Sequence, residues 1–436
     1  MTVHGRIGVI GLGLLLASAC TGAAPEAPKP PAAAPTAATA RHLDPQYAWH
    51  GENRALLDAM LDAEGRGSPT YDRANKPLAT FDFDNTLVRN DVGFATFFWM
   101  LAHDKFLQPP AKDWGKTSRW MTPAARDALN TACGALAEAG QPLPTSTNPP
   151  CADELLSLYA TGKTHAGAVA FEGANPRKME PSFAWGAAAQ AGHTPDELRD
   201  YANAALDEYL GKPVGSTMTI GTTEGLDGYL RLYEPMKDLI GALQEDGFDV
   251  WVVSASPQPI VEVAAARMGI DASHVIGVRL LQSADGKYRS GLAGCGMFGD
   301  GEDGVMTYMD GKRCWINKVI FGDDSAAALV KARDPKLRPT FAAGDSDTDI
   351  TFLRDAKYRL TINRNSDELM CHAYARRGDH WLVNPMFVDP KPKREQPYDC
   401  TTACKSEQGQ PGQCLDDDSK PIAPQEDAVF GEVAAP

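Results

Sequence analysis

Short apolar runs, each ending in polar or charged residues, recur along this chain and predict buried strands. Segments with apolar residues at helical spacing lie between these runs, which predicts helices that cover a sheet of parallel strands. We therefore expect an α/β protein with a Rossmann-like parallel sheet core. Strands are predicted at 78–84, 249–254, 340–344 and 358–362, and helices at 49–63, 236–245, 257–268, 313–320 and 347–356.

The stretch from 94 to 229 interrupts this alternation and predicts a helical insertion in the core. It consists of helical patches separated by loops rich in Pro and Gly. Within it, Thr194-Pro195-Asp196-Glu197 has the form of a capping box with Pro at the first helical position, which predicts a helix through Tyr209. After the insertion, the turn sequence Ala284-Asp285-Gly286 predicts a hairpin between 275–281 and 287–290.

The first 20 residues predict a targeting segment. Arg6 precedes the apolar stretch 7–16, which is too short to span a bilayer and has the flanks of a signal peptide. Small residues directly before Cys20 resemble a bacterial lipobox, which would leave Cys20 lipidated as the mature N-terminus. Ordinary secretion stays open, because Ala17 stands where Leu is commoner in that motif.

The rest of the chain divides by composition. A stretch rich in Pro and Ala predicts a disordered linker. The end of the chain is rich in Pro, Lys, Asp and Gln, which predicts an irregular tail tied by cysteines. We expect a protein of the bacterial cell envelope, lipid-anchored and facing the periplasm, with a soluble periplasmic or secreted protein as the alternative. The predicted divisions are a signal peptide at 1–20, a linker at 21–45, a core at 46–93 and 230–390, a helical insertion at 94–229 and a tail at 391–436.

The cysteines favour disulfides. Without Cys20 their number is even, which in an exported protein predicts pairing. Proximity in sequence suggests Cys133–Cys151 and Cys295–Cys314. The last four cysteines, from Cys371 to Cys414, would pair among themselves. A zinc site is the rival interpretation, but the chain offers neither a Cys-x-x-Cys pair nor clustered His to support it.

The charge limits the partners. A formal net charge of −15 argues against binding to nucleic acid and to an anionic membrane surface. No segment after the first 20 residues is long and apolar enough to cross a membrane. Contact with a membrane is therefore expected only through the lipid anchor at Cys20.

Two acidic stretches far apart in the chain carry the clearest chemistry. Phe81–Thr86 and Gly344–Asp349 each follow a predicted buried strand. Reactive groups gather beyond the carboxyl ends of parallel strands, so neighbouring strands would bring the carboxylates together. Converging carboxylates cannot all stay ionised without a cation, and oxygen ligands suit Mg²⁺. The plain alternative is two acidic turns. The predicted ligands are Asp82, Asp84, Asp345 and Asp349.

Two more polar residues complete an ordered set. Ser254 ends the strand at 249–254, and Lys312 opens the helix at 313–320. The order Asp-x-Asp-x-Thr, Ser, Lys and Gly-Asp-x-x-x-Asp resembles the haloacid dehalogenase superfamily of phosphohydrolases. That resemblance implies a Rossmann-like core, and it implies that the insertion is a cap domain closing over the active site, as in phosphoserine phosphatase-like members.

The resemblance also implies a role for each residue. Asp82 would be the nucleophile that forms an aspartyl-phosphate, and Asp84 the general acid and then base. Asp345 would bind Mg²⁺ with Asp82 and the backbone carbonyl of Asp84, and Asp349 would be a ligand or support one. Phosphoryl oxygens would be bound by Thr86, Ser254 and Lys312.

Three neighbouring residues are weaker candidates. Lys318 is a rival to Lys312, but it should lie in the middle of the helix and be exposed. Ser256 is a rival to Ser254, but it precedes Pro257 and is expected to cap the next helix. Asp347 is expected to be a helix N-cap or solvated.

Within the superfamily, the core resembles exported bacterial phosphorylcholine phosphatases. This implies phosphocholine or phosphoethanolamine as substrate, and the insertion offers aromatic and acidic side chains for a cation. The alternatives are a phosphoserine phosphatase, a broad acid phosphatase and a non-catalytic envelope binding lipoprotein. The matching pieces are Phe81–Thr86, Glu234-Pro235, Val253–Ala255, Gly311-Lys312, Arg338-Pro339 and Ala343–Asp345, and the side chains offered are Trp99, Trp114, Trp120, Phe183, Trp185, Glu172 and Glu180.

Overall fold

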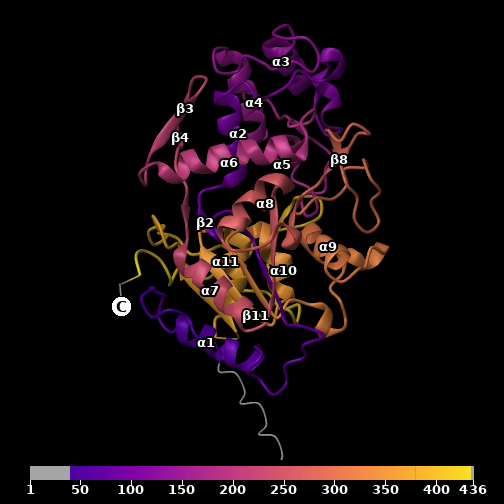
Figure 1. The fold of residues 1–436 in the computed structure, drawn as a ribbon. Helices are drawn as coiled ribbons and strands as arrows, with labels where there is room; N and C mark the ends of the chain where they lie inside the picture. The colour runs from indigo at the N-terminus through magenta and orange to yellow at the C-terminus, as the bar shows by residue number, and fades with distance from the viewer. Residues whose placement is uncertain (1–39, 379, 434–436) are drawn as a thin grey trace, which may run out of the picture. The chain divides into compact units, whose positions relative to one another are not determined.

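The computed structural model describes residues 40–378 and 380–433. Its core is a six-stranded sheet in the order β12-β11-β10-β1-β6-β7, and every pair of neighbours in it is parallel. The predicted Rossmann-like parallel sheet is therefore confirmed (Figure 1). The strands are β1 (Leu78–Phe81), β6 (Asp249–Pro257), β7 (Val275–Val278), β10 (Phe341–Gly344), β11 (Tyr358–Asn363) and β12 (Trp381–Pro385).

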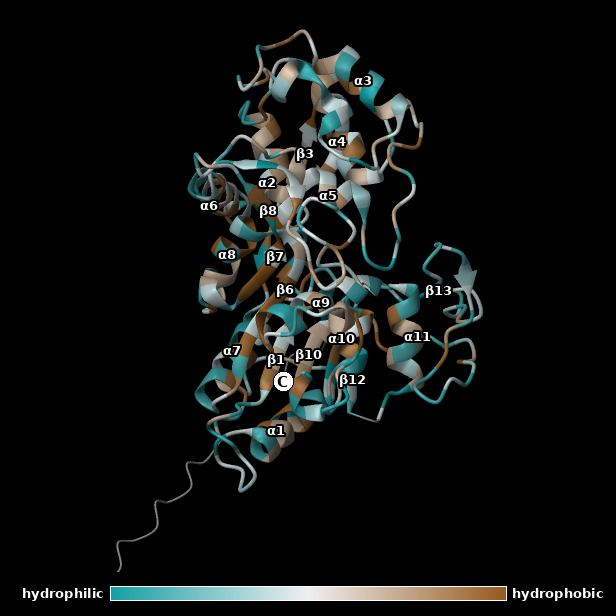
Figure 2. Ribbon diagram, turned by 90° about the vertical axis from the view of Figure 1, so that its right-hand side faces the viewer, coloured by the Kyte–Doolittle hydropathy of each residue, from teal (hydrophilic) through white to brown (hydrophobic). Residues whose placement is uncertain are grey.

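Helices cover both faces of this sheet, so its central strands are largely buried. All residues of β1 and β10 are buried, and Figure 2 shows these strands as hydrophobic ribbons inside the fold. Val252 and Val253 belong to separate core clusters, as side chains that alternate between the two faces must. The core helices are α1 (Asn53–Glu64), α7 (Glu234–Glu245), α8 (Gln258–Arg267), α9 (Asp310–Val319), α10 (Ile350–Asp355) and α11 (Asp367–Ala375).

The insertion leaves and rejoins the core through a two-stranded neck. Here β2 (Val88–Arg89) pairs antiparallel with β5 (Arg231–Leu232). The predicted capping box is present, because Thr194 Oγ1 accepts from the Glu197 amide and Glu197 accepts from the Thr194 amide. A hairpin that was not predicted, β3 (Thr217–Ile220) with β4 (Thr223–Asp227), follows the last helix. The helices are α2 (Val92–Ala102), α3 (Pro123–Cys133), α4 (Pro149–Thr161), α5 (Pro181–Ala188) and α6 (Pro195–Gly211).

A second segment, residues 279–309, packs against the insertion. It contains the hairpin of β8 (Leu280–Gln282) and β9 (Tyr288–Leu292), so the predicted strand at 275–281 is divided between β7 and β8. The Tyr288 backbone exchanges hydrogen bonds of 2.8 Å with Gly192 and His193 of the insertion. Met179 of the insertion joins Leu280 and other apolar residues of the 279–309 segment in one buried cluster.

Arg177 anchors the insertion at a further point. Its Nε lies 3.3 Å from a carboxylate oxygen of Asp310, the first residue of α9. Its Nη1 lies 3.2 Å from Glu368 of α11 and donates to the backbone carbonyl of Lys405 in the tail. The insertion is therefore held by the neck, by the 279–309 segment and by this arginine.

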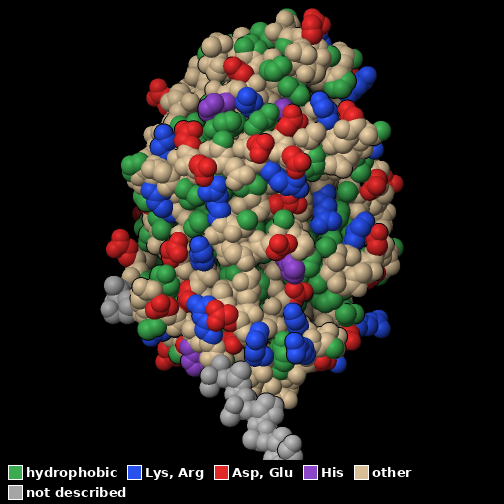
Figure 3. All heavy atoms as spheres, viewed as in Figure 1, with side chains coloured by type: hydrophobic (Ala, Val, Ile, Leu, Met, Phe, Trp, Pro, Cys, Tyr) green, Lys and Arg blue, Asp and Glu red, His purple; other side chains and the backbone are tan. Residues whose placement is uncertain are grey.

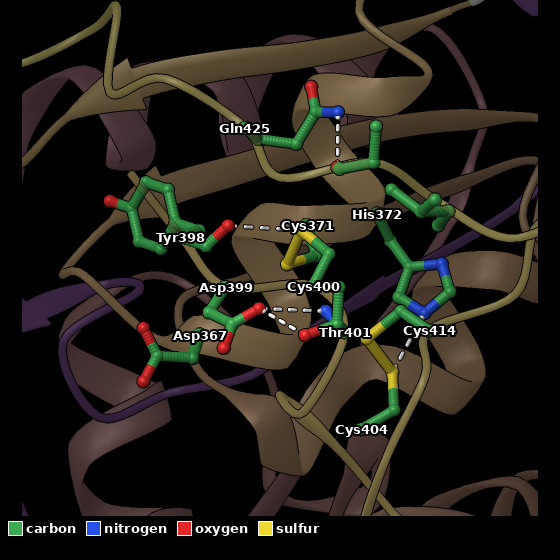
Figure 4. The surroundings of a disulfide bond; sticks show 12 residues. Asp367, Cys371, His372, Tyr398, Asp399, Cys400, Thr401, Cys404, Cys414 and Gln425 are labelled. Carbon is green, nitrogen blue, oxygen red and sulfur yellow. Dashed lines mark hydrogen bonds between the residues drawn. A yellow bond between two sulfur atoms is a disulfide. The ribbon is translucent and has the colours of Figure 1, made fainter. Parts of the chain in front are cut away.

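All eight cysteines of the described chain form disulfides. The predicted pairs Cys133–Cys151 and Cys295–Cys314 are present. The last four pair among themselves as expected, and Cys371–Cys400 ties the tail to α11 beside Tyr398 (Figure 4). Cys404 and Cys414 lie close to His372, but because they are bonded to one another they do not form a metal site.

The end of the predicted linker is part of the packed core. Leu43 is buried, and Arg41 forms ion pairs with Asp238 and with Glu245 of α7. The predicted signal peptide, Cys20 and residues 21–39 lie outside the described residues. Among the residues that are described, the helices are too short or too polar to span a bilayer. Charges of both signs are intermingled over the face drawn in Figure 3.

Candidate active site

Adjacent strands bring the sequence motifs to one edge of the sheet. In the order β10-β1-β6, the central strand β1 is followed by Asp82 and Asp84. Asp345 follows β10 on one side, and Ser254 lies in β6 on the other side. The Asp82 amide donates to the Ala343 carbonyl at 2.9 Å, which continues the strand pairing up to the first acidic residue.

Lys312 lies at the centre of this group. Its Nζ is 2.6 Å from Asp82 Oδ1 and 2.5 Å from Asp349 Oδ1, and its side chain is 0% exposed. Burial disfavours the ammonium, but the carboxylates of Asp349 and Asp82 outweigh burial and raise the pKa of Lys312. The rival, Lys318, instead contacts Asp324 and the Gly294 carbonyl, away from the acidic group.

Thr86 is directed toward the two acidic motifs. Its hydroxyl donates to Asp345 Oδ1 at 2.9 Å and lies 3.5 Å from Asp82 Oδ2. Asn85 has a φ of 60°, a left-handed conformation that Asn tolerates better than most residues, and it turns the chain sharply after Asp84. This turn places the buried Thr86 beside the carboxylates.

Asp84 faces two serines. Its Oδ2 accepts from Ser256 Oγ at 2.8 Å and from Ser254 Oγ at 3.3 Å, and its Oδ1 accepts from the Val92 amide at 2.7 Å. The expectation that Ser256 caps a helix is wrong, because β6 continues through Pro257, which itself occupies the cap position of α8. Burial, and then the charge of Asp91, raise the pKa of Asp84 to about 8.

A raised pKa favours the protonated form of the Asp84 carboxyl group. Such a group can donate that proton to a leaving oxygen, as a general acid must. The three donors around the Asp84 side chain leave it poorly placed as a metal ligand. If Asp84 contributes to a metal site, its backbone carbonyl is the available group.

The other carboxylates fit a divalent cation. Oxygen atoms of Asp82, Asp345 and Asp349 lie within 4.8 Å of one another. Asp345 Oδ2 is buried and accepts no hydrogen bond from the described residues. Burial raises the pKa of Asp345, and burial followed by the Asp349 charge raises that of Asp82 to about 7. These carboxylates offer only oxygen ligands and carry an excess of negative charge, which suits Mg²⁺.

The two remaining acidic residues of the second motif have supporting positions. Asp349 Oδ2 accepts from the amides of Asp345 and Ser346, while its Oδ1 is held by Lys312. This favours a role in orienting the site over direct metal binding. Asp347 accepts from the Leu369 amide in the first turn of α11, but the N-cap of that helix is Ser366 and the N-cap before Asp347 is Ser346, so the expectation that Asp347 is an N-cap is wrong.

Sequence reasoning missed two charged residues of the site. Asp91, the N-cap of α2, accepts from the Phe94 amide at 2.8 Å, and burial raises its pKa to about 6. Arg364 directly follows β11, and its Nε lies 3.2 Å from Asp345 Oδ2. The signal for Arg364 was present, because it follows the predicted strand at 358–362 just as the acidic motifs follow theirs.

A cavity of about 770 Å³ lies between this sheet edge and the insertion. Phe183 is the one aromatic side chain of those proposed from the sequence that lines it. Trp114 and Trp185 are instead buried inside the insertion. The described residues at the cavity include the rings of Phe94, Tyr159, Phe183 and Tyr308 and the cations of Arg89, Arg364 and Lys391.

Residues 173–354 match the family described as haloacid dehalogenase-like hydrolase. The match contains Ser254, Lys312, Asp345 and Asp349, and β1 brings Asp82, which precedes it, to the same site. This part of the chain is similar to haloacid dehalogenase-like hydrolases, which supports the prediction of an enzyme. No curated protein matches the chain.

Three solved structures resemble the fold. A functionally unknown protein from Anaerococcus prevotii DSM 20548 has a TM-score of 0.56 at 18% identity, over 80% of this chain and 94% of that one. A protein of unknown function from Bordetella pertussis Tohama I has a TM-score of 0.41 at 16% identity, over 71% and 98%. A phospho-aspartyl intermediate analogue of phosphoserine phosphatase has a TM-score of 0.30 at 15% identity, over 66% and 87%.

Replacing Lys312 by Met should destabilise the protein strongly. Two buried carboxylates would lose their shared cation, and breaking a buried ion pair typically costs about 3–5 kcal/mol. We expect this loss in urea unfolding without added metal at neutral pH. Lys318→Met is the matched control on the same helix, with a partly exposed side chain. Equal stability of the two variants would contradict the central position assigned to Lys312.

Proposed function

We propose that this protein is a Mg²⁺-dependent phosphomonoesterase that acts on a small phosphate ester through an aspartyl-phosphate. One observation carries the proposal: Asp82 is held by Lys312 next to Asp84, whose own surroundings favour the protonated form. A nucleophile and a proton donor on one turn are what in-line phosphoryl transfer requires.

In the first step, a carboxylate oxygen of Asp82 forms a bond to phosphorus while the bond from phosphorus to the ester oxygen breaks. Asp84 gives its proton to the departing oxygen. In the second step, Asp84 takes a proton from water, whose oxygen attacks phosphorus and releases Asp82 and inorganic phosphate. The hydroxyls of Thr86 and Ser254 and the ammonium of Lys312 are the donors for the phosphoryl oxygens. Bound Mg²⁺ would add positive charge for those oxygens.

Phosphocholine or phosphoethanolamine is the substrate class that the aromatic side of the cavity supports. The ring of Phe94 lies 4.5 Å from that of Tyr159 and 6.3 Å from that of Phe183. Asp91 lies beside them at the start of α2. Aromatic faces with a nearby carboxylate are suited to a substituted ammonium group.

The cationic residues of the cavity lining support a second candidate. Arg89, Arg364 and Lys391 line the same cavity, and guanidinium groups bind carboxylates through paired hydrogen bonds. An ester that carries an ammonium and a carboxylate, such as phosphoserine, would use both the aromatic and the cationic residues. The further alternatives are a broad acid phosphatase and a non-catalytic binding lipoprotein. A comparison of substrates distinguishes both from the phosphocholine and phosphoserine candidates.

The location in the cell envelope is also a proposal. It is supported by the signal-like segment before Cys20 and by four disulfides, which persist in oxidising compartments. An acidic chain with a lipid at Cys20 would be attached to the membrane through that lipid alone.

The nucleophile can be tested directly. Asp82→Asn should abolish phosphate release, because an amide cannot form the acyl phosphate, while circular dichroism should show an intact fold. Beryllofluoride should bind the wild-type protein and not the variant. Asp347→Asn, in the same acidic edge but hydrogen-bonded to the first turn of α11, should retain most turnover. Full activity of Asp82→Asn would refute the covalent mechanism.

The substrate class is tested by a comparison of esters. A cation against aromatic faces gains roughly 0.5–2 kcal/mol, so kcat/KM for phosphocholine should exceed that for glycerol phosphate by about 2- to 30-fold. Free choline should inhibit competitively, and Phe183→Ala should reduce the preference. Equal rates without choline inhibition would support a broad acid phosphatase, and a preference for phosphoserine would support the second candidate. No turnover of any ester would favour the binding lipoprotein.

Export is tested by labelling in a bacterial host. A labelled fatty acid should be incorporated into the full-length chain, and Cys20→Ser should lose the label because the acceptor thiol is gone. Mass spectrometry should then find the mature N-terminus at Cys20. A free N-terminus elsewhere would identify a soluble periplasmic or secreted protein instead.

A further inference from the structure

Arg364 occupies a fixed position at the active edge. It follows β11, the neighbour of β10, so it leaves the sheet beside Asp345. The turn around it is held from both sides: Asn363 Oδ1 accepts from the Asn365 amide, and Asn363 Nδ2 donates to Asp427 of the tail. The Arg364 side chain is 38% exposed, and it lines the cavity that contains the catalytic carboxylates.

The guanidinium of Arg364 has donors that are not used. Its Nε faces Asp345 Oδ2, but its two terminal nitrogens make no hydrogen bond with the described residues. Two other cations at the site differ. Lys312 is shared by two carboxylates, and Arg89 is paired with Asp389 and bonded to Asn90. Arg364 can therefore bind a further anion without first losing an existing partner.

Arg364 and a divalent cation would compete for the same oxygen, Asp345 Oδ2. Asp345 belongs to the carboxylate set that fits a divalent cation, and its Oδ2 is buried and accepts no hydrogen bond from the described residues, which leaves that oxygen available to a metal. A cation bound there would stand next to the Arg364 guanidinium, and like charges at such short range repel strongly. Binding of the cation must therefore displace the arginine from Asp345.

We propose that Arg364 is a resident counter-ion of the metal site that becomes a phosphate ligand. Without a divalent cation it neutralises Asp345. When the cation takes Oδ2, the guanidinium is released into the cavity, where its planar fork matches two oxygens of a phosphoryl group. The second half of this inference rests on the proposed function; the first half does not.

This exchange couples the two ligands. A cation that frees the arginine makes phosphate bind more tightly, and by linkage phosphate makes the cation bind more tightly. Removal of the arginine should therefore have opposite effects on the affinities for the cation and for phosphate. The cation would lose a competitor, whereas phosphate would lose a donor.

The test compares the wild-type protein with Arg364→Gln, Arg364→Lys and Lys391→Gln, using calorimetric titration. Lys391→Gln is the matched control, because it removes a positive charge from the same cavity without an ion pair to Asp345. Arg364→Gln should bind Mg²⁺ about fivefold more tightly, the scale of one ion pair. It should bind inorganic phosphate, in the presence of Mg²⁺, about tenfold more weakly. Its unfolding temperature in EDTA should fall.

Arg364→Lys, which keeps the charge but not the fork, should retain wild-type Mg²⁺ affinity and lose part of the phosphate affinity. An unchanged or weaker Mg²⁺ affinity in a folded Arg364→Gln would overturn the counter-ion role. Unchanged phosphate affinity would overturn the ligand role. None of these measurements needs turnover, so a protein that hydrolyses no ester but shows the Mg²⁺ effect would refute the proposed function alone.

Discussion

The neutralisation of buried carboxylates is the constraint on which the rest of this structure depends. Asp82, Asp345 and Asp349 converge because two neighbouring strands, β1 and β10, end at one edge of a parallel sheet. Buried carboxylates repel one another and lose their hydration, so they persist only where positive charge reaches them. Lys312 supplies that charge from α9 to two of them, and Arg364 supplies it to the third from the end of β11.

The placement of Lys312 in turn depends on elements outside the sheet. The Met309 amide at the entry to α9 donates to the Thr348 carbonyl of the acidic loop. Asp310, the next residue, accepts from Thr351 Oγ1 and pairs with Arg177 of the insertion. Cys314, further along the same helix, is bonded to Cys295 of the 279–309 segment. The acidic loop, the insertion and the 279–309 segment thus all fix the helix that carries the lysine.

The sheet and the main acidic motifs could be predicted because buried strands leave a strong apolar signal. Elements and residues with weaker sequence signals could not be predicted. Ser256 was misjudged because Pro257 is typical of a helix start, whereas β6 continues through it. The strand β12 ends in Pro385 at the edge of the sheet, where a missing backbone donor is tolerated but the sequence resembles a loop. The hairpin β3–β4 is largely exposed, and the alternation of Thr with Met218 and Ile220 in β3 is too short to indicate a strand and is not continued in β4.

The anchoring of the insertion has a consequence for how molecules reach the cavity. A domain joined to its neighbour by one hinge can swing, but this one is fixed at the neck, along the 279–309 segment and through Arg177. Three separated attachments oppose a swing of the insertion about the neck alone. Any widening of the cavity would have to break contacts along the 279–309 segment or at Arg177 as well, so those distant contacts bear on access to the catalytic carboxylates.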